Sequence, residues 1–185
     1  MVNDMEKLHL YLVRHCESLG NHENIFQGQL DLDISATGEK QLALLALRFR
    51  NIPIDAVYSS PLKRAYKTAE AVDLYHSLPI IKLPELMEVD VGALSSMKLD
   101  KAFTDYPVFA EKWQNSPQNC IFPEGETTAE VYDRAKKALA RVKADCMGKT
   151  AVITSHGFLL RCMACEILEH DICLLYTSPS PRDCS

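Results

Sequence analysis

The chain has 185 residues, of which 47% are hydrophobic and 24% are charged, and this length and composition predict one folded globular domain. The same composition excludes disordered and collagen-like chains. A formal net charge of -5 and an isoelectric point near 5.7 argue against a nucleic-acid-binding surface, so any anionic ligand must be held by local positive charge.

The N-terminal segment indicates neither secretion nor membrane insertion. Residues 1–7 are mostly polar, and the apolar run 8–13 is too short for a signal-peptide core or a membrane span. We therefore expect a cytoplasmic protein without a membrane partner. The seven cysteines are then interpreted as reduced thiols. Because a structural zinc needs four ligands, we interpret the close pair Cys162 and Cys165 as buried helix residues and predict no metal site.

The first predicted strand ends at a histidine. Residues 8–13 are continuously apolar and lead into Arg14 and His15, which is typical of a strand buried on both faces with polar function at its carboxyl end. After a polar loop, Ser35 can cap a helix. This helix is expected to cover one face of the sheet, because apolar residues recur in it at helical spacing: Leu42, Leu45 and Phe49.

A second buried strand is predicted at residues 55–60. Ser60 and Pro61 have the residue types of a helix N-cap and of the first helical position. The following helix would therefore carry Arg64 in its first turn.

The middle of the chain gives weaker signals. A third strand is predicted around residues 80–83, and apolar residues alternate in 86–92, as in a strand, before a glycine breaks the pattern. The segment that follows, up to Pro123, is irregular and carries no prediction.

The clearest helix prediction begins at Thr127, which forms a capping-box pair with Glu130. Residues 151–154 then form a short buried strand that ends near His156 and runs into an apolar helix at 158–168. Strands that alternate with helices imply a three-layer α/β/α sandwich with a mainly parallel central sheet. In the helix that begins at Thr127, the apolar residues are three and four positions apart, namely Val131, Ala135, Ala138, Val142 and Cys146.

Residues 173–185 break this pattern. They have no helical or strand period and contain two prolines, which is typical of a flexible terminus. The string also resembles the translation of a sequencing adaptor, and we interpret it as a non-native tail. The folded domain would then cover residues 1–172 and be incomplete at its C-terminus.

Two histidines are expected at one edge of the sheet. His15 and His156 each follow a predicted buried strand, and open α/β proteins bind ligands at the carboxyl ends of their strands. Each histidine alone has a structural interpretation. The presence of Arg14 and Arg64 favours a functional interpretation instead, because guanidinium groups bind phosphate oxygens bidentately and keep their charge. In an acidic protein, this convergence of positive groups favours an anionic ligand.

Residues 12–18, Leu-Val-Arg-His-Cys-Glu-Ser, together with Asn21 resemble the opening motif of the histidine phosphatase (phosphoglycerate mutase-like) superfamily. The resemblance spans about residues 8 to 170 and implies the fold of that superfamily. One departure is Cys16, where the family usually has glycine, and the loop would be strained if this position required a glycine conformation. Further motifs follow in the order of the family: Gly28 with Asp31 and Gly38, residues 59–65, 86–88, 123–126 and 155–157.

The resemblance implies a metal-independent phosphatase that needs no cofactor and acts on a small phosphorylated metabolite. His15 would attack phosphorus and become a phosphohistidine, which water hydrolyses. Flanking arginines would keep the ring neutral, and a backbone acceptor would fix its tautomer. His156, Arg14 and Arg64 would stabilise the transferring phosphoryl oxygens.

The resemblance also suggests a proton donor and residues that contact the substrate. Glu88 would protonate the leaving alkoxide, since a carboxyl group beside a phosphate dianion keeps its proton more readily. Glu85 is the nearby rival for this role. Asn21, Gln27 and Gly28 lie where relatives contact the phosphate or the rest of the substrate.

Other functions share parts of this pattern. A 2,3-bisphosphoglycerate-dependent phosphoglycerate mutase would use the same site, but the compact segment 92–123 favours a phosphatase. A catalytically inactive phosphate-binding fragment and a redox protein built on the cysteine pair are further alternatives. Sugar phosphates, phosphoglycerates, nucleotide-like esters and α-ribazole phosphate all stay open as substrates, and the oligomeric state cannot be predicted from the sequence.

Overall fold

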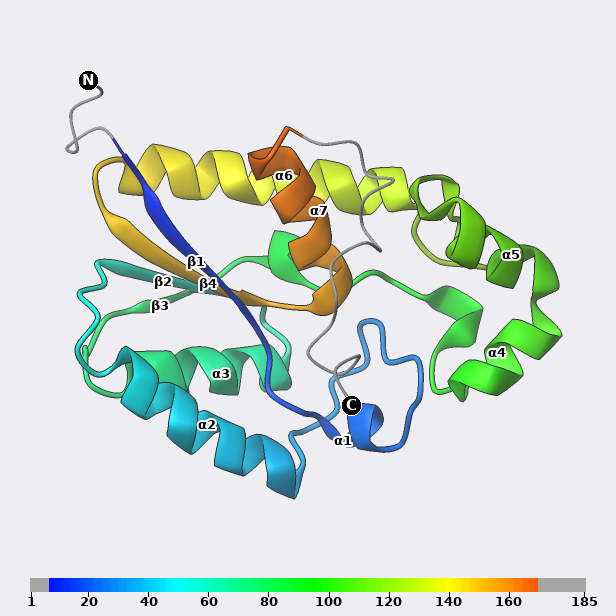
Figure 1. Cartoon of the computed structure of the whole chain (residues 1–185), viewed down its shortest axis with the longest axis horizontal. Coiled ribbons are helices and arrows are strands. Elements are labelled where there is room, and N and C mark those ends of the chain that lie inside the picture. The colour runs from blue at the N-terminus through cyan, green and yellow to red at the C-terminus, as the bar shows by residue number, and fades with distance from the viewer. Residues whose placement is uncertain (1–6, 170–185) are drawn as a thin grey trace.

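The strands of the sheet are all parallel and lie in the order β1-β4-β2-β3 in the computed structural model, which describes residues 7–169 (Figure 1). The predicted tail at 173–185 lies outside the described residues. In chain order the strands are β1 (His9–Arg14), β2 (Ala56–Ser59), β3 (Ile80–Lys82) and β4 (Thr150–Ser155).

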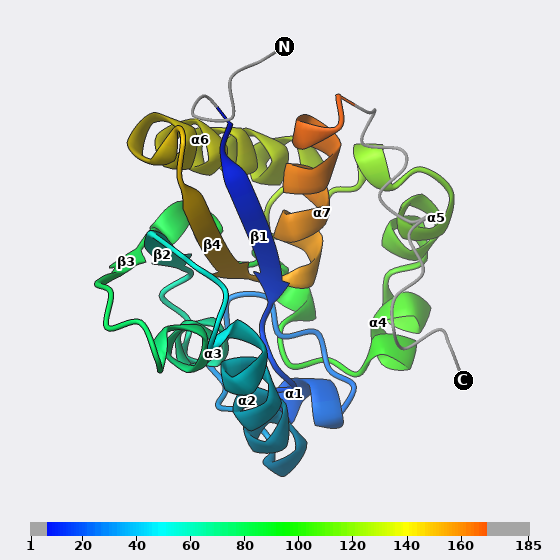
Figure 2. The ribbon, with the colours of Figure 1, turned by 60° about the vertical axis from the view of Figure 1, so that its left-hand side comes forward.

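Helices cover both faces of this sheet, which confirms the predicted three-layer α/β/α architecture (Figures 1 and 2). Because strand side chains alternate between the faces, Val57 and Val152 pack against α2 and α3, whereas Tyr58 and Ile153 pack toward α6 and α7. The covering helices are α2 (Ala36–Phe49) and α3 (Lys63–Asp73) on one face and α6 (Thr128–Cys146) and α7 (Gly157–Ile167) on the other.

The segment without a sequence prediction forms two helices beyond α7, at the side of the molecule (Figure 2). Aromatic side chains join it to the core: the Trp113 ring stacks on Phe158 with centroids 5.8 Å apart, and Phe109 contacts Phe122 at 5.2 Å. Within residues 7–169, no helix combines the length and the apolar character needed to span a bilayer. The remaining elements are α1 (Leu19–His22), α4 (Leu99–Asp105), α5 (Pro107–Asn115) and the 3₁₀ turns Pro84–Leu86, Gly92–Leu94 and Pro117–Asn119.

Two of the predicted helix caps, Ser35 and Thr127, are confirmed. The Ser35 hydroxyl accepts a hydrogen bond from the Gly38 amide and begins α2. At α6, the Thr127 hydroxyl accepts from the Glu130 amide while the Glu130 carboxylate accepts from the Thr127 amide. The predicted apolar face of α6 is buried, since no side chain on it is more than 2% exposed: Val131, Ala135, Ala138, Val142 and Cys146.

The prediction that the first strand is buried on both faces was wrong. Within residues 7–169, β1 pairs with β4 alone and lies at the edge of the sheet, and Tyr11 on it is 38% exposed. Its apolar side chains Leu8, Leu10 and Leu12 line a groove of about 1180 Å³ that α6 and α7 also border. A continuous apolar run indicates apolar surroundings, but it does not tell whether a strand is central or at an edge.

Two further predictions need correction. Helix α3 begins at Lys63 with Leu62 as its N-cap, two residues later than predicted, because the Ser60 side chain is used in another contact described below. Residues 86–92 form no strand. Their alternating apolar side chains belong instead to a loop between two 3₁₀ turns, whose buried residues are Leu86, Val89 and Val91.

We expect Thr127→Ala to lower the free energy of unfolding by about 1 kcal/mol, because the substitution leaves the Glu130 amide without its capping acceptor. Urea denaturation measures the change. Thr127→Ser is the matched control, since it keeps the hydroxyl and should stay close to wild type. Equal destabilisation by both substitutions would contradict a capping role.

Candidate active site

The parallel pairing of β1 with β4 brings the two predicted histidines together. Arg14 lies opposite Ser155 in the register, and the His15 amide donates to the Ser155 carbonyl at 2.9 Å. The rings of His15 and His156 have centroids 5.1 Å apart. After β1 the chain continues to α2 on one face of the sheet, and after β4 it enters α7 on the other. In doubly wound folds, ligands bind at the carboxyl ends of the strands where neighbouring connections diverge in this way.

A backbone carbonyl orients the ring of His15. Its Nδ1 lies 2.6 Å from the Cys16 carbonyl oxygen, which can only accept, so Nδ1 carries a proton and Nε2 is the nitrogen that has the lone pair in the neutral ring. The Cys16 amide donates to the Thr68 hydroxyl at 3.1 Å. Cys16 is absent from the described residues with positive φ, so this position accommodates a side chain without the strain considered above.

Arg64 is buried beside the histidines, with 1% of its surface exposed. Its two terminal nitrogens donate to the carbonyls of Leu30 and Gly28 at 2.7 and 2.8 Å. Its Nε is buried without a hydrogen-bond partner among residues 7–169. Burial lowers the pKa of Arg64, which nearby Glu88 counteracts. A buried guanidinium with an unused N–H favours an anionic ligand at this place.

Gly28 is needed for the placement of Arg64. Its φ of +49° is in the left-handed region, and a Cβ added to it would lie 2.7 Å from Val91 Cγ2. The predicted contact of Gly28 with substrate is untested, but its carbonyl holds the Arg64 guanidinium in this structure.

His156 is fully buried, and its ring contacts Ser60. The Nε2 atom lies 2.8 Å from the Ser60 hydroxyl, which accepts from the Leu62 amide at 3.3 Å. Because a hydroxyl group can donate one hydrogen bond and accept two, this contact fits a ring proton on either nitrogen of His156. The Nδ1 atom is buried without a hydrogen-bond partner among the described residues. Burial, reinforced by the Arg64 charge, holds the pKa of His156 well below its usual value of 6.5.

Glu88 and Arg14 flank the first turn of α7. The Glu88 carboxylate accepts from the amides of Phe158 and Leu159 at 3.2 and 3.3 Å. The Arg14 guanidinium lies over Gly157, where an added Cβ would be 3.4 Å from its Nε and Cζ. The five residues predicted to be catalytic therefore come from separate segments to the carboxyl ends of β1 and β4.

The predicted contacts Asn21 and Gln27 take part in local structure. The Asn21 side-chain oxygen accepts from the Ser18 amide at 3.2 Å and completes the capping box of α1. The Ser18 hydroxyl lies 2.9 Å from the same oxygen and 2.7 Å from the Gln27 side-chain oxygen. Both amide oxygens thus hold the loop after β1, and their contact with substrate stays a prediction.

Sequence reasoning missed several supporting residues. Ser60 was assigned to a helix cap, whereas it orients His156. Thr68 and Arg134 lie inside helices where nothing distinguishes them from other polar positions. Glu126 belongs to a motif quoted for the family resemblance, but no role was assigned to it.

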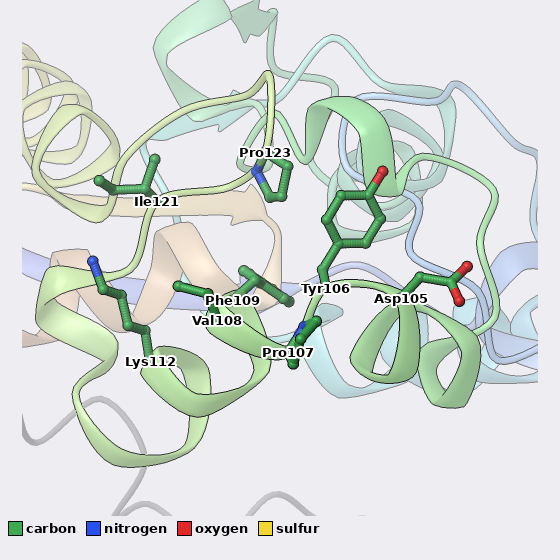
Figure 3. A pocket seen from close by; sticks show the side chains of 8 residues that line it. All are labelled: Asp105, Tyr106, Pro107, Val108, Phe109, Lys112, Ile121 and Pro123. Atoms are coloured by element: carbon green, nitrogen blue, oxygen red, sulfur yellow. The ribbon is translucent and has the colours of Figure 1, made fainter.

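A separate pocket of about 360 Å³ lies in the irregular segment (Figure 3). Residues from α4, α5 and the chain before α6 form it, and none of the predicted site residues lines it. The pocket is bordered by Asp105, Tyr106, Pro107, Val108, Phe109, Lys112, Ile121 and Pro123.

Comparison with known proteins identifies similar sequences over most of the chain. Residues 10–182 match the histidine phosphatase superfamily (branch 1). The chain is 38% identical over 163 residues to phosphoserine phosphatase 1 of Hydrogenobacter thermophilus, which covers 88% of this chain and 77% of the relative. It is 32% identical over 161 residues to a probable phosphoglycerate mutase, GpmB, of Escherichia coli, with coverage of 87% and 75%.

Solved structures share the fold. YhfR of Bacillus stearothermophilus superposes with a TM-score of 0.88 at 26% identity, over 94% of this chain and 86% of that chain. A mycobacterial glucosyl-3-phosphoglycerate phosphatase solved with VO3 gives a TM-score of 0.83 over 92% and 86% of the two chains. At 23% identity, this second likeness shows the fold alone.

The lowered pKa of His156 predicts acid sensitivity. Because the folded state resists protonation of this ring and the unfolded state does not, the free energy of unfolding should fall as pH drops below about 6.5. The decrease contributed by this group is at most about 1.4 kcal/mol per pH unit. Urea denaturation between about pH 5 and 8 measures it.

His156→Gln should flatten this pH dependence, and His9→Gln, on an exposed residue of β1, is the control. An NMR titration in which the His156 ring protonates near pH 6.5 would contradict the prediction.

Proposed function

Since the chain belongs to the histidine phosphatase superfamily (branch 1) and is a phosphatase of that type, we propose that it hydrolyses small phosphomonoesters through a phosphohistidine on His15. One observation carries the proposal, namely the hydrogen bond between His15 Nδ1 and the Cys16 carbonyl. Because this bond fixes a proton on Nδ1, the neutral ring would present the lone pair of Nε2 for attack on phosphorus.

The site also supplies donors for the transferring phosphoryl group. Arg64 Nε is a buried N–H group without a partner among residues 7–169, and a phosphoryl oxygen would satisfy it. His156 Nδ1 is likewise buried without a partner among these residues, and we assign its ring proton to Nδ1 in the phosphate-bound state, where it would donate to a second phosphoryl oxygen. Arg14 adds a third positive or donor group at the start of α7. In this proposal the arginines stabilise the charge that a metal ion stabilises in other phosphatases, so hydrolysis should survive chelation.

We assign the proton transfers to Glu88. In the first step the bond from His15 Nε2 to phosphorus forms, the ester P–O bond breaks, and the protonated Glu88 carboxyl gives its proton to the leaving oxygen. In the second step water attacks phosphorus, Glu88 takes the water proton, and the bond to His15 breaks. The carboxyl is close enough to Arg64 to affect the pKa of that guanidinium, which supports its place in the site.

Chemistry shared among the relatives supports a substrate class. Phosphoserine and phosphoglycerate, for which similar proteins are named, carry a phosphomonoester on a small carboxylic acid. We propose a free, small phosphorylated metabolite of this kind in the cytoplasm as the substrate. A phosphoglycerate mutase would instead return the phosphoryl group to a second hydroxyl. Incubation with 3-phosphoglycerate separates the two functions. Release of free phosphate would support hydrolysis, whereas formation of 2-phosphoglycerate would overturn it.

His15→Ala should lower kcat/KM for p-nitrophenyl phosphate by about 10³-fold or more in the presence of EDTA, because it removes the nucleophile. His9→Ala, on the same strand, should leave activity unchanged. Rapid quenching in alkali followed by mass spectrometry should find the phosphoryl group on His15 of the wild type. Unimpaired hydrolysis by His15→Ala would disprove the proposed mechanism.

The effect of Glu88→Gln on kcat/KM should depend strongly on the leaving group of the substrate. For an alkyl phosphate such as phosphoserine, whose alkoxide needs a proton, we expect kcat/KM to fall by about 10²-fold or more. For p-nitrophenyl phosphate, whose leaving group departs without a proton, the loss should stay below about tenfold. Glu85→Gln tests the rival carboxyl and should leave kcat/KM unchanged for both substrates. A uniform loss with both substrates would argue against Glu88 as the acid.

A further inference from the structure

Arg134 on α6 holds the chain segment that carries Glu88. Its Nη1 donates to the carbonyls of Glu85 and Met87 at 2.9 and 3.0 Å, and its Nη2 donates to the Glu88 carbonyl at 3.3 Å. Its Nε and Nη2 also form a two-point contact with the Glu126 carboxylate at 2.7 and 2.8 Å. All five N–H groups of the guanidinium are therefore used.

Glu126 extends this contact to the far side of the segment. Its carboxylate accepts from the Asp90 amide at 2.8 Å, and its own amide donates to the Asp90 carbonyl at 2.9 Å. The Gln29 side chain adds a bond of 3.2 Å to the Glu88 carbonyl. Backbone atoms before, at and after Glu88 are thus fixed by side chains that lie outside the loop.

The Glu88 carboxylate accepts its shortest hydrogen bond, 3.0 Å, from the amide of Val89 in the same segment. Its contacts with the Phe158 and Leu159 amides are 3.2 and 3.3 Å long, at the weak end of the range for N–H···O hydrogen bonds. A proton donor must leave such contacts to reach the leaving oxygen. Its starting position is therefore determined mainly by the backbone, and the backbone is held by Arg134 and Glu126.

We infer that Arg134, paired with Glu126, is a positioning residue that places the Glu88 carboxyl for proton transfer to the leaving group. This inference rests on the proposed function. Arg134 touches the backbone of residues 85–88 and not the reacting atoms, and its charge is matched by Glu126 in a pair whose side chains are each 20% exposed. Lysine cannot replace it, because an ammonium group has three N–H donors on one atom and lacks the planar fork.

The test compares two leaving groups in Arg134→Lys. Because only the alkyl phosphate needs the acid, kcat/KM for phosphoserine should fall about tenfold or more, while p-nitrophenyl phosphate changes less than about threefold. In the Glu88→Gln background, the same substitution should have little further effect on phosphoserine, since the group that it positions is already lost. Glu126→Gln should likewise lower kcat/KM for phosphoserine more than kcat/KM for p-nitrophenyl phosphate.

Arg141→Lys is the matched control, because Arg141 lies on the same helix in an exposed pair with Asp145 and should leave both substrates at wild-type rates. Thermal unfolding of each variant shows whether the fold persists. Equal losses with both substrates in Arg134→Lys and Glu126→Gln, or full additivity with Glu88→Gln, would overturn the inference. That result would leave the phosphatase function intact, whereas a wild type that hydrolyses neither substrate overturns the function and the inference together.

Discussion

The parallel register of β1 against β4 is the constraint on which the candidate site depends. It places Arg14 beside Ser155, so that the next residue of each strand is a histidine and the two rings lie 5.1 Å apart. The connections after these strands leave toward opposite faces of the sheet, which is where doubly wound folds bind their ligands. A shift of one residue in the register would turn His15 to the other face and separate the pair.

Beside this pair, the protein buries a positive charge and satisfies it with backbone groups. The net charge of the chain is -5, yet Arg64 is 1% exposed and hydrogen bonds to two backbone carbonyls. Carbonyls satisfy the N–H groups and leave the positive charge in place. Burial and the Arg64 charge lower the pKa of the neighbouring His156 ring. A phosphate dianion would offset the Arg64 charge and accept from its Nε–H, which has no partner among residues 7–169.

Local chemistry explains why much of this could be predicted from the sequence. The cap at Thr127 and the histidines after two strands depend on neighbouring residues in the chain, and each has a recognisable pattern. The edge position of β1 could not be predicted, because an apolar run looks the same in the centre of a sheet. Nor could the role of Ser60, whose partner His156 lies 96 positions away. Residues 86–92 resemble a strand in sequence because a loop buries several of their apolar side chains, Leu86, Val89 and Val91, in the same core.

The two arginines near the site differ in their partners. Among residues 7–169, Arg64 donates hydrogen bonds to carbonyl oxygens, which leave its positive charge in place for an anionic ligand. Arg134 also bonds to three carbonyls, but the Glu126 carboxylate faces it at 2.7 Å and offsets much of its charge. Arg64 is therefore suited to attract an anion, whereas Arg134 is suited mainly to hold the backbone in place. A site that must bind a phosphate dianion and still keep a carboxyl beside it needs both, because an unpaired second guanidinium there would favour the ionised carboxylate over the proton donor.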